Sequence, residues 1–149
     1  MYLLDTNHCS RLLDGHPEII AKLSALDDTP IVTCTVVRGE LMFMAHKSER
    51  KAENLERVEG FLRDIEILPV DEKAADIYGK MKAAIIDFYG PKEKKKRRKA
   101  TIDRLGFTEN DLWIAAVAKS NDLTIVSRDV DFTRLNEVEE IRVESWINS

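Results

Sequence analysis

Five acidic side chains stand where a short apolar run ends or where a helix is predicted to begin. Asp5 follows the apolar run 2–4, and Asp129 and Asp131 follow the run 123–127. Glu40 and Asp111 each lie in the first turns of a predicted helix. Carboxylate oxygens are the ligands that hard ions such as Mg²⁺ and Mn²⁺ prefer. Because such ions polarise phosphodiesters and activate water, the chemistry available to these residues is metal-dependent hydrolysis.

Each acid also has a structural interpretation. Asp5 could cap the first helix, and Asp111 stands at a capping-box-like position. Asp129 and Asp131 could stabilise an Asx turn, and Glu40 could face solvent. For any single residue the structural interpretation is favoured, whereas the combination is harder to explain. Two carboxylates about 5 Å apart repel by roughly 3 kcal/mol at an effective dielectric near 20. Since no buried Lys or Arg is evident from the sequence, a divalent cation is the expected neutralising partner.

These acids need a scaffold that brings them together, and the hydrophobic pattern predicts one. Short apolar runs alternate with amphipathic, capped segments, which is typical of an α/β/α sandwich with a short-stranded central parallel sheet. Ligands bind at the carboxyl ends of such strands. We therefore expect the acids to converge on one rim. Strands are predicted at 2–4, 31–33, 65–68, 123–127 and 141–143. Helices are predicted from 6 to about 13, from 17, from 36 after a Thr35 cap, over about 52–62, from 72 to 89 and from 109.

Length and composition predict one domain, 1–149, in a soluble, globular and cytoplasmic protein. The chain has 149 residues, of which 44% are hydrophobic and 34% charged. No apolar run approaches the roughly 18 residues that a transmembrane helix needs. The amino terminus lacks the features of a signal peptide. Cys9 and Cys34 form no Cys-x-x-Cys pair and are interpreted as buried free thiols.

The net charge of −4 is distributed unevenly. Residues 92–99 carry +6, so the remainder of the chain carries −10. This basic octet could be a solvated loop, or it could contact the phosphate backbone of a nucleic acid. Composition alone leaves the two readings open. Its candidate RNA-binding residues are Lys92, Lys94, Lys95, Lys96, Arg97, Arg98 and Lys99.

Four short motifs resemble, in order, those of the PIN domain. They are Leu4-Asp5-Thr6-Asn7, Arg38-Gly39-Glu40-Leu41, Asn110-Asp111-Leu112-Trp113-Ile114-Ala115-Ala116 and Val126-Ser127-Arg128-Asp129-Val130-Asp131-Phe132. Each motif is unspecific alone, but four in the right order over nearly the whole chain are specific. Their spacing is most similar to that of the VapC-type toxins of bacterial toxin–antitoxin pairs.

The resemblance implies functions for particular residues. It implies metal-binding, catalytic roles for Asp5, Glu40, Asp111 and Asp129, with Asp131 as an extra or substitute ligand. It implies further that three polar residues orient the acids. These are Thr6, Asn7 and Ser127.

The resemblance also implies an activity and partners. The activity is Mg²⁺-dependent hydrolysis of RNA, often of structured RNA such as tRNA, with Mn²⁺ as a substitute. The partners are a second copy of the chain, in a homodimer, and a small antitoxin whose tail enters the acidic site. The loop 90–107 is longer and more basic than is usual in the family. Because it leads into the helix bearing Asp111, we expect it at the mouth of the site, in contact with RNA or with the antitoxin.

Several alternatives remain at this stage. A housekeeping RNA-processing nuclease and a catalytically silent PIN module that binds RNA or protein both stay open, as do one metal against two. A dehalogenase-type phosphatase is disfavoured because Asn7 stands where its second aspartate would be, and a receiver domain because the third strand ends at Leu68. The three histidines are interpreted as structural or surface residues, and His8 is the only one of them near enough to the rim to matter. Trp113 and Trp146 are interpreted as core or dimer-contact residues.

Overall fold

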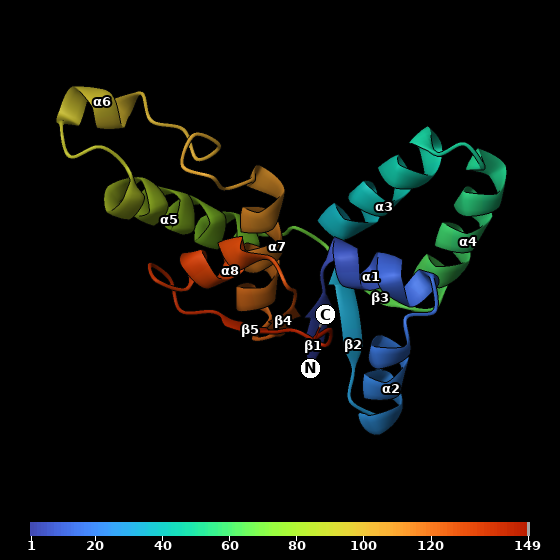
Figure 1. Cartoon of the computed structure of the whole chain (residues 1–149). Coiled ribbons are helices and arrows are strands. Elements are labelled where there is room, and N and C mark those ends of the chain that lie inside the picture. Colours follow the sequence, from blue (N-terminus) through green and yellow to red (C-terminus); the bar gives the residue numbers. More distant parts are fainter. Residues whose placement is uncertain (149) are drawn as a thin grey trace.

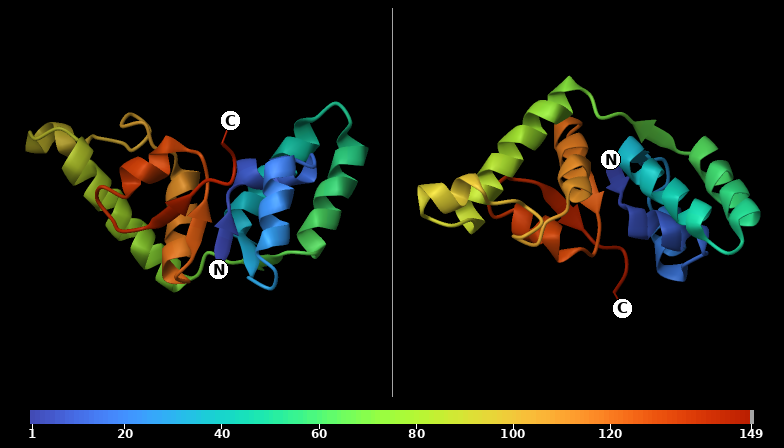
Figure 2. Two further views of the ribbon diagram at one scale, coloured as in Figure 1. Left: turned by 60° about the horizontal axis from the view of Figure 1, so that its bottom comes forward. Right: turned by 90° about the horizontal axis from the view of Figure 1, so that it is seen from above.

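The computed structural model describes residues 1–148, which form a five-stranded parallel sheet with helices on both faces (Figures 1 and 2). The strand order is β3-β2-β1-β4-β5, so the first strand lies at the centre. The predicted fold class, an α/β/α sandwich, is confirmed. The strands are β1 (Tyr2–Leu4), β2 (Ile31–Cys34), β3 (Glu66–Leu68), β4 (Thr124–Val126) and β5 (Arg142–Glu144).

The helices divide into two groups that lie on either side of the central strands (Figure 1). The amino-terminal group consists of α1 (Thr6–Leu13), α2 (Pro17–Ala25), α3 (Thr35–Lys47) and α4 (Lys51–Arg63). The carboxyl-terminal group consists of α5 (Glu72–Tyr89), α6 (Lys94–Arg98), α7 (Glu109–Ser120) and α8 (Val130–Leu135). None of the helices formed by residues 1–148 is long and apolar enough to cross a membrane.

Local sequence explains where the helices that carry the site begin. The Asp5 side chain caps α1, and the Thr108 side chain accepts from the backbone N–H of Asp111 to cap α7. Asp129 caps α8 in the same way. A side-chain oxygen at this position satisfies one of the free N–H groups of the first turn. The structural interpretation of Asp5 as a cap is therefore correct, and it coexists with a place on the rim.

Helix α7 is the most deeply buried helix of the molecule and gives Asp111 a rigid base. Six of its twelve residues are buried, among them three alanines that let neighbouring helices approach closely. It packs chiefly against α5, whose buried side chains Met81 and Ile85 face it across the core. Such close packing resists small displacements. The position of the first turn of α7 is consequently well defined.

Two helices are absent from the sequence prediction. Residues 94–98 form α6 although the whole segment 90–107 was expected to be a loop, because Lys and Arg are good helix formers. Residues 130–135 form α8, whose buried Phe132 and Leu135 are three residues apart and anchor one face. The last strand lies one residue further along the chain than expected. Cys9 and Cys34 are free and buried, as predicted, and burial raises the pKa of both thiols.

Candidate metal centre

Three carboxylates meet at the carboxyl end of β4. Asp111, Asp129 and Asp131 each place one carboxylate oxygen within 4.8 Å of the oxygens of the other two. All three side chains are half-buried. Two oxygens on opposite sides of a Mg²⁺ ion lie about 4.2 Å apart, twice the usual bond length. The spacing and the all-oxygen donor set therefore fit a hard divalent cation after small adjustments.

The pKa of Asp111 reflects its burial and the acids that lie close to it. Burial raises the pKa of the Asp111 carboxyl to about 7, and the negative charge of Asp129 adds to the rise. Asp131 and Glu40 contribute smaller repulsions of the same sign. Without a cation, the first turn of α7 thus carries a carboxyl that retains its proton near neutral pH. A cation would remove the cost of ionising it.

Asp129 and Asp131 are held by the turn between β4 and α8. The Asp129 backbone N–H donates to Ser127 Oγ at 3.0 Å, and Asp129 Oδ1 accepts from the Asp131 backbone N–H at 2.9 Å. Ser127 itself is buried directly after β4. Burial also raises the pKa of Asp131, with Asp129 adding to the rise and Arg134 opposing it. The turn therefore fixes both acids through backbone contacts.

Asp5 occupies the neighbouring strand end and is stabilised by hydrogen bonds instead. Its backbone N–H donates to the carbonyl of Val126 at 3.1 Å, which ties the end of β1 to the end of β4. Its side chain is almost fully buried. Asp5 Oδ1 accepts from the His8 backbone N–H at 2.8 Å and lies 3.0 Å from His8 Nδ1. Both contacts go to one oxygen and leave Oδ2 outside them.

His8, interpreted from the sequence as a structural or surface residue near the rim, contributes to the site by holding Asp5. The imidazole is fully buried, and its Nε2 accepts from the Trp146 backbone N–H at 3.4 Å. Because Nε2 is an acceptor, the proton belongs on Nδ1, which donates to Asp5. His8 thus orients Asp5 and links it to the carboxyl-terminal segment. The available signal was its position three residues after a capping aspartate, where the two side chains share a helix face.

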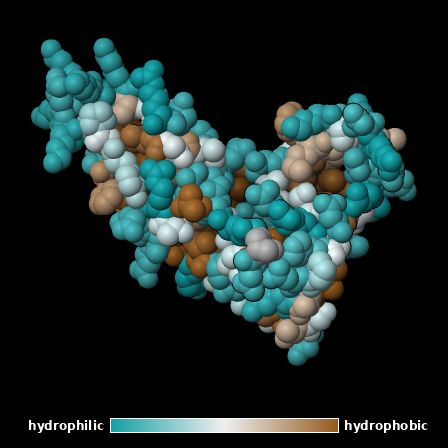
Figure 3. All heavy atoms as spheres, in the orientation of Figure 1, coloured by the Kyte–Doolittle hydropathy of each residue, from teal (hydrophilic) through white to brown (hydrophobic). Residues whose placement is uncertain are grey.

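Glu40 extends the rim from the side of α3. Thr6 Oγ1 donates to Glu40 Oε1 at 2.6 Å, so the residue next to Asp5 orients this glutamate. Thr6, Glu40 and Asn110 line one groove of about 600 Å³, together with Thr35, Val36, Gly39, Phe43 and Met44. The hollow between the two groups of helices is visible in Figure 3.

The structure thus brings the predicted acids to one rim, with a clear division. Asp111, Asp129 and Asp131 form the compact group, whereas Asp5 and Glu40 stand beside it and are already hydrogen-bonded. Asn7, expected to help orient the acids, is exposed on α1.

Arg134 is a residue that sequence reasoning missed. Its Nη1 lies 3.6 Å from Asp131 Oδ1. The sequence shows no buried Lys or Arg beside the acids, and Arg134, which faces Asp131, is only half-buried. The missing information was α8, since only a helix brings residues 131 and 134 onto the same face.

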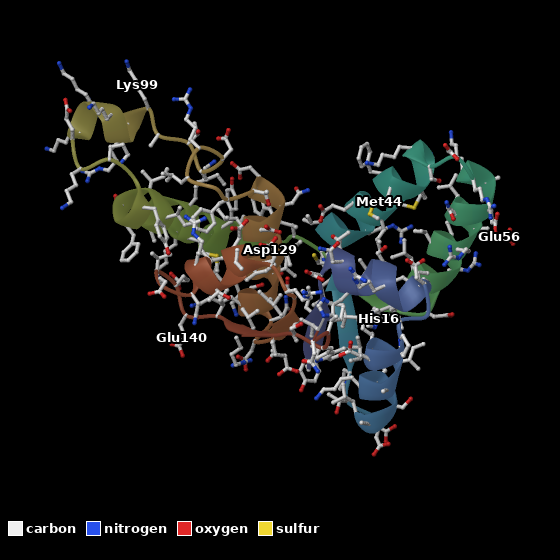
Figure 4. The ribbon with its side chains drawn as sticks, in the orientation of Figure 1. His16, Met44, Glu56, Lys99, Asp129 and Glu140 are labelled. Carbon is white, nitrogen blue, oxygen red and sulfur yellow. The ribbon has the colours of Figure 1, made fainter. Side chains whose placement is uncertain are left out.

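The basic octet does not lie at the mouth of the site. Figure 4 places Lys99 at the outer end of the carboxyl-terminal group, far from Asp129, and all views of the ribbon agree on the position of α6. Lys82 of α5 donates to Glu109 in the first turn of α7 at 2.8 Å. From Lys82 to the end of α5 the helix rises by roughly another 10 Å before α6 begins. The expectation that the octet borders the acids was wrong because α5 continues past α7 before the chain turns back. At the other end of the predicted loop 90–107, Leu105 and Phe107 contact Arg134, which faces Asp131.

Comparison with known proteins gives a consistent result. The family model described as the PIN domain matches residues 2–138. The chain is 32% identical to Ribonuclease VapC2 of Haemophilus influenzae, with 98% of each chain covered. It is 30% identical to the tRNA(fMet)-specific endonuclease VapC of Salmonella typhimurium, with 97% of each covered.

Solved structures agree with these relatives. The fold is similar to DNA-bound VapBC from Salmonella typhimurium, with a TM-score of 0.75 at 28% identity and 98% of each chain covered. It is also similar to VapBC-5 of Mycobacterium tuberculosis, a member of the VapBC family of toxin-antitoxin systems, with a TM-score of 0.63 at 27% identity and coverage of 96% and 94%. With the acids at one rim and this match along the chain, the protein belongs to the PIN-domain family, in its VapC-type branch.

Proposed function

We propose that this protein is a Mg²⁺- or Mn²⁺-dependent endoribonuclease that acts as the toxin of a toxin–antitoxin pair. The observation that carries the proposal is the compact group of Asp111, Asp129 and Asp131 at the carboxyl end of a parallel sheet. Three carboxylates without enough positive charge around them are costly unless a cation binds. Relatives over the full length of the chain are named ribonuclease and tRNA(fMet)-specific endonuclease.

The side chains divide the work of such a site. Asp111, Asp129 and Asp131 would hold the ion, with Asp5 and Glu40 completing the acidic rim. A bound divalent ion supplies a polarised phosphodiester and an activated water for in-line attack. Thr6 and His8 keep Glu40 and Asp5 in fixed orientations through the hydrogen bonds described above. Fixed orientation lowers the reorganisation needed when substrate and cation bind.

The basic octet is proposed as a contact for the RNA backbone away from the acidic rim. Six of its seven basic side chains are exposed, and Lys96 makes one weak pair with Glu93 at 3.7 Å. The teal cluster at the tip of the molecule in Figure 3 belongs to this segment. Phosphates neutralised there would release counterions and hold an RNA that also reaches the acids. The body of the chain, at −10, would repel RNA without such a contact.

Protein partners follow from the same family. VapBC-5 of Mycobacterium tuberculosis belongs to a toxin–antitoxin system, and we expect an antitoxin here whose tail enters the acidic rim. A homodimer is also expected. Phe43 and Phe88, 63% and 61% exposed, supply apolar area for such partners. An RNA substrate and two free thiols suit action in the cytoplasm.

The proposal is tested by incubating the purified chain with total tRNA. Cleavage with Mg²⁺, its loss in EDTA and its recovery with Mn²⁺ are the expected results. RNA that is bound but never cut, with either metal, would instead indicate a silent PIN module. Cleavage that continues unchanged in EDTA would contradict the metal-dependent mechanism.

A further inference from the structure

Arg134, at the penultimate position of α8, is held by surroundings that do not involve the acids. Its Nη2 donates to the carbonyl of Leu105 at 2.8 Å. Its guanidinium carbon lies 4.2 Å from the centre of the Phe107 ring and 4.8 Å from that of Tyr89. The Tyr89 hydroxyl also donates to the Arg134 backbone carbonyl at 2.9 Å. One guanidinium therefore joins α5, α8 and the segment that leads into α7.

The backbone of that segment is shaped around the guanidinium. Gly106 has φ +88°, a conformation that side-chain-bearing residues rarely adopt. A Cβ at this position would lie 3.0 Å from Arg134 Nη1. The glycine thus permits both the turn and the close approach. Since contacts on several sides fix the guanidinium, its position is set independently of Asp131.

This fixed cation faces one member of the acidic group. Arg134 Nη1 lies 3.6 Å from Asp131 Oδ1, one helical turn away. Asp131 in turn has an oxygen within 4.8 Å of Asp111 and Asp129. We propose that Arg134 is a positioning residue for the metal centre, which selects the side-chain orientation that keeps the Asp131 carboxylate in the acidic group. The inference rests on the proposed function, because it assumes that the group binds a divalent ion.

The contacts also explain why the residue is arginine. A planar guanidinium can stack on two rings, donate to a carbonyl and face a carboxylate at the same time. A lysine ammonium would retain the charge but would not stack in the same way, so its position would be less defined. Arg134 also lies outside the oxygen group itself. It can therefore orient Asp131 without occupying the place of the cation.

The test measures Mn²⁺ affinity by calorimetry for four forms of the full chain: wild type, Arg134→Met, Asp131→Asn and the double variant. Arg134→Met is expected to weaken binding about 10-fold, the lower end of the effect of residues that orient metal ligands. Asp131→Asn should weaken it at least as much. The double variant should match Asp131→Asn, because Arg134 acts through Asp131. Arg142→Met, which removes an exposed arginine that pairs with Asp122 at 2.9 Å, is the matched control and should leave affinity unchanged.

Other results would overturn the inference. Wild-type affinity in Arg134→Met, or an equal loss with and without Asp131, would show that Arg134 does not act through this carboxylate. Absence of Mn²⁺ binding to the wild-type chain would overturn the proposed function and this inference together. If Arg134→Met does not fold, Arg134→Lys takes its place in the same comparison.

A second measurement decides the case in which Asp131→Asn alone abolishes binding. A crystal structure of metal-free Arg134→Met should show the Asp131 carboxylate moved out of the group while residues 105–107 keep their positions. The reverse, a displaced segment 105–107 with Asp131 still beside Asp111 and Asp129, would show that Arg134 only tethers the backbone.

Discussion

The two sides of the acidic rim stabilise their carboxylates in different ways. On the side of β1, Asp5 is almost fully buried, but His8 supplies two donors to one of its oxygens. On the side of α7 and α8, burial raises the pKa of the half-buried Asp111 to about 7, and the negative charges of Asp129, Asp131 and Glu40 add to the rise. The two sides therefore differ in the hydrogen-bond donors around their carboxylates and in the number of acids that lie close together.

The difference indicates a division of labour. On the Asp5 side, hydrogen bonds within the protein hold the carboxylate, so this side can keep a fixed position. The carboxylates of Asp111, Asp129 and Asp131 are held in position, but their negative charge is not fully compensated. This group is therefore the part of the rim that a cation stabilises most. A site with both features can bind an ion tightly without rearranging.

The largest expected effect follows from removing one acid from either side. Asp111→Asn and Asp5→Asn should each lower RNA cleavage by at least about 1000-fold, the scale on which loss of a key electrostatic group acts. Both variants should remain folded by circular dichroism. Asp122→Asn, an exposed acid paired with Arg142, should cut normally. Wild-type rates in either of the first two variants would remove that side from the active site.

Metal binding should stabilise the protein through the α7–α8 side. At a concentration 100 times the dissociation constant, an ion that binds only the folded state adds about 2.7 kcal/mol. For a domain of this size that corresponds to a rise in Tm of roughly 5–10 °C. Mg²⁺ or Mn²⁺ should produce it in the wild type but not in Asp111→Asn, as measured by calorimetry. An unchanged Tm at millimolar metal would contradict the division of labour.

His8→Leu tests the Asp5 side. It removes the side-chain donor and leaves a buried carboxylate with fewer partners, so the free energy of unfolding should fall by about 1–3 kcal/mol. Urea unfolding measures the change. His46→Leu, at the end of α3, is the matched control and should have little effect. If His8→Leu is as stable as the wild type, hydrogen bonding is not what makes Asp5 acceptable in its buried position.

The pH dependence of stability without metal should come from Asp111, on the side of α7 and α8. The folded-state pKa of Asp111, about 7, lies above its ordinary value of 3.8. The folded state therefore binds the proton more tightly, and this contribution is fully present below about pH 4 and is lost as pH rises through 7. We expect the Tm in EDTA to fall by a few degrees between pH 6 and 8. The fall should be smaller in Asp111→Asn; an equal fall would assign it to other groups.

The smallest expected effect concerns the basic octet, which lies outside both sides of the acidic rim. Replacing Lys94, Lys95 and Lys96 by Gln should weaken RNA binding about 10-fold and flatten its salt dependence, since fewer counterions are released. The change should appear in KM and leave kcat close to that of the wild type, because α6 lies away from the acids. Lys22→Gln on α2 is a control for general charge. Unchanged RNA binding would indicate that the octet is only a solvated segment.

Much of this arrangement could be predicted from local patterns. Asp5, Asp111 and Asp129 stand at strand ends and helix starts, and in a parallel sheet such positions share one edge. The roles of His8 and Arg134 could not be read in that way. The role of His8 depends on its hydrogen bond with Trp146, which is far from it in sequence. The role of Arg134 depends on its contacts with the rings of Tyr89 and Phe107.

The basic octet illustrates a different limit. Its composition predicted a loop, and its position before Asp111 suggested proximity to the site. Adjacency in sequence was misleading because residues 99–107 turn back along the core, with Ile102 and Phe107 buried. The length of α5 beyond its contact with Glu109 determines where the octet lies. No local sequence pattern predicts that contact.

The proposed mechanism requires a hard divalent ion to bind between Asp111, Asp129 and Asp131. The most direct measurement is anomalous diffraction from crystals of the full chain soaked in Mn²⁺. We expect a peak about 2.0–2.3 Å from oxygens of these residues, within the range for Mn²⁺–oxygen bonds, and no peak there in Asp111→Asn. A saturated soak with no peak at this rim, or one that persists unchanged in the variant, would contradict this mechanism.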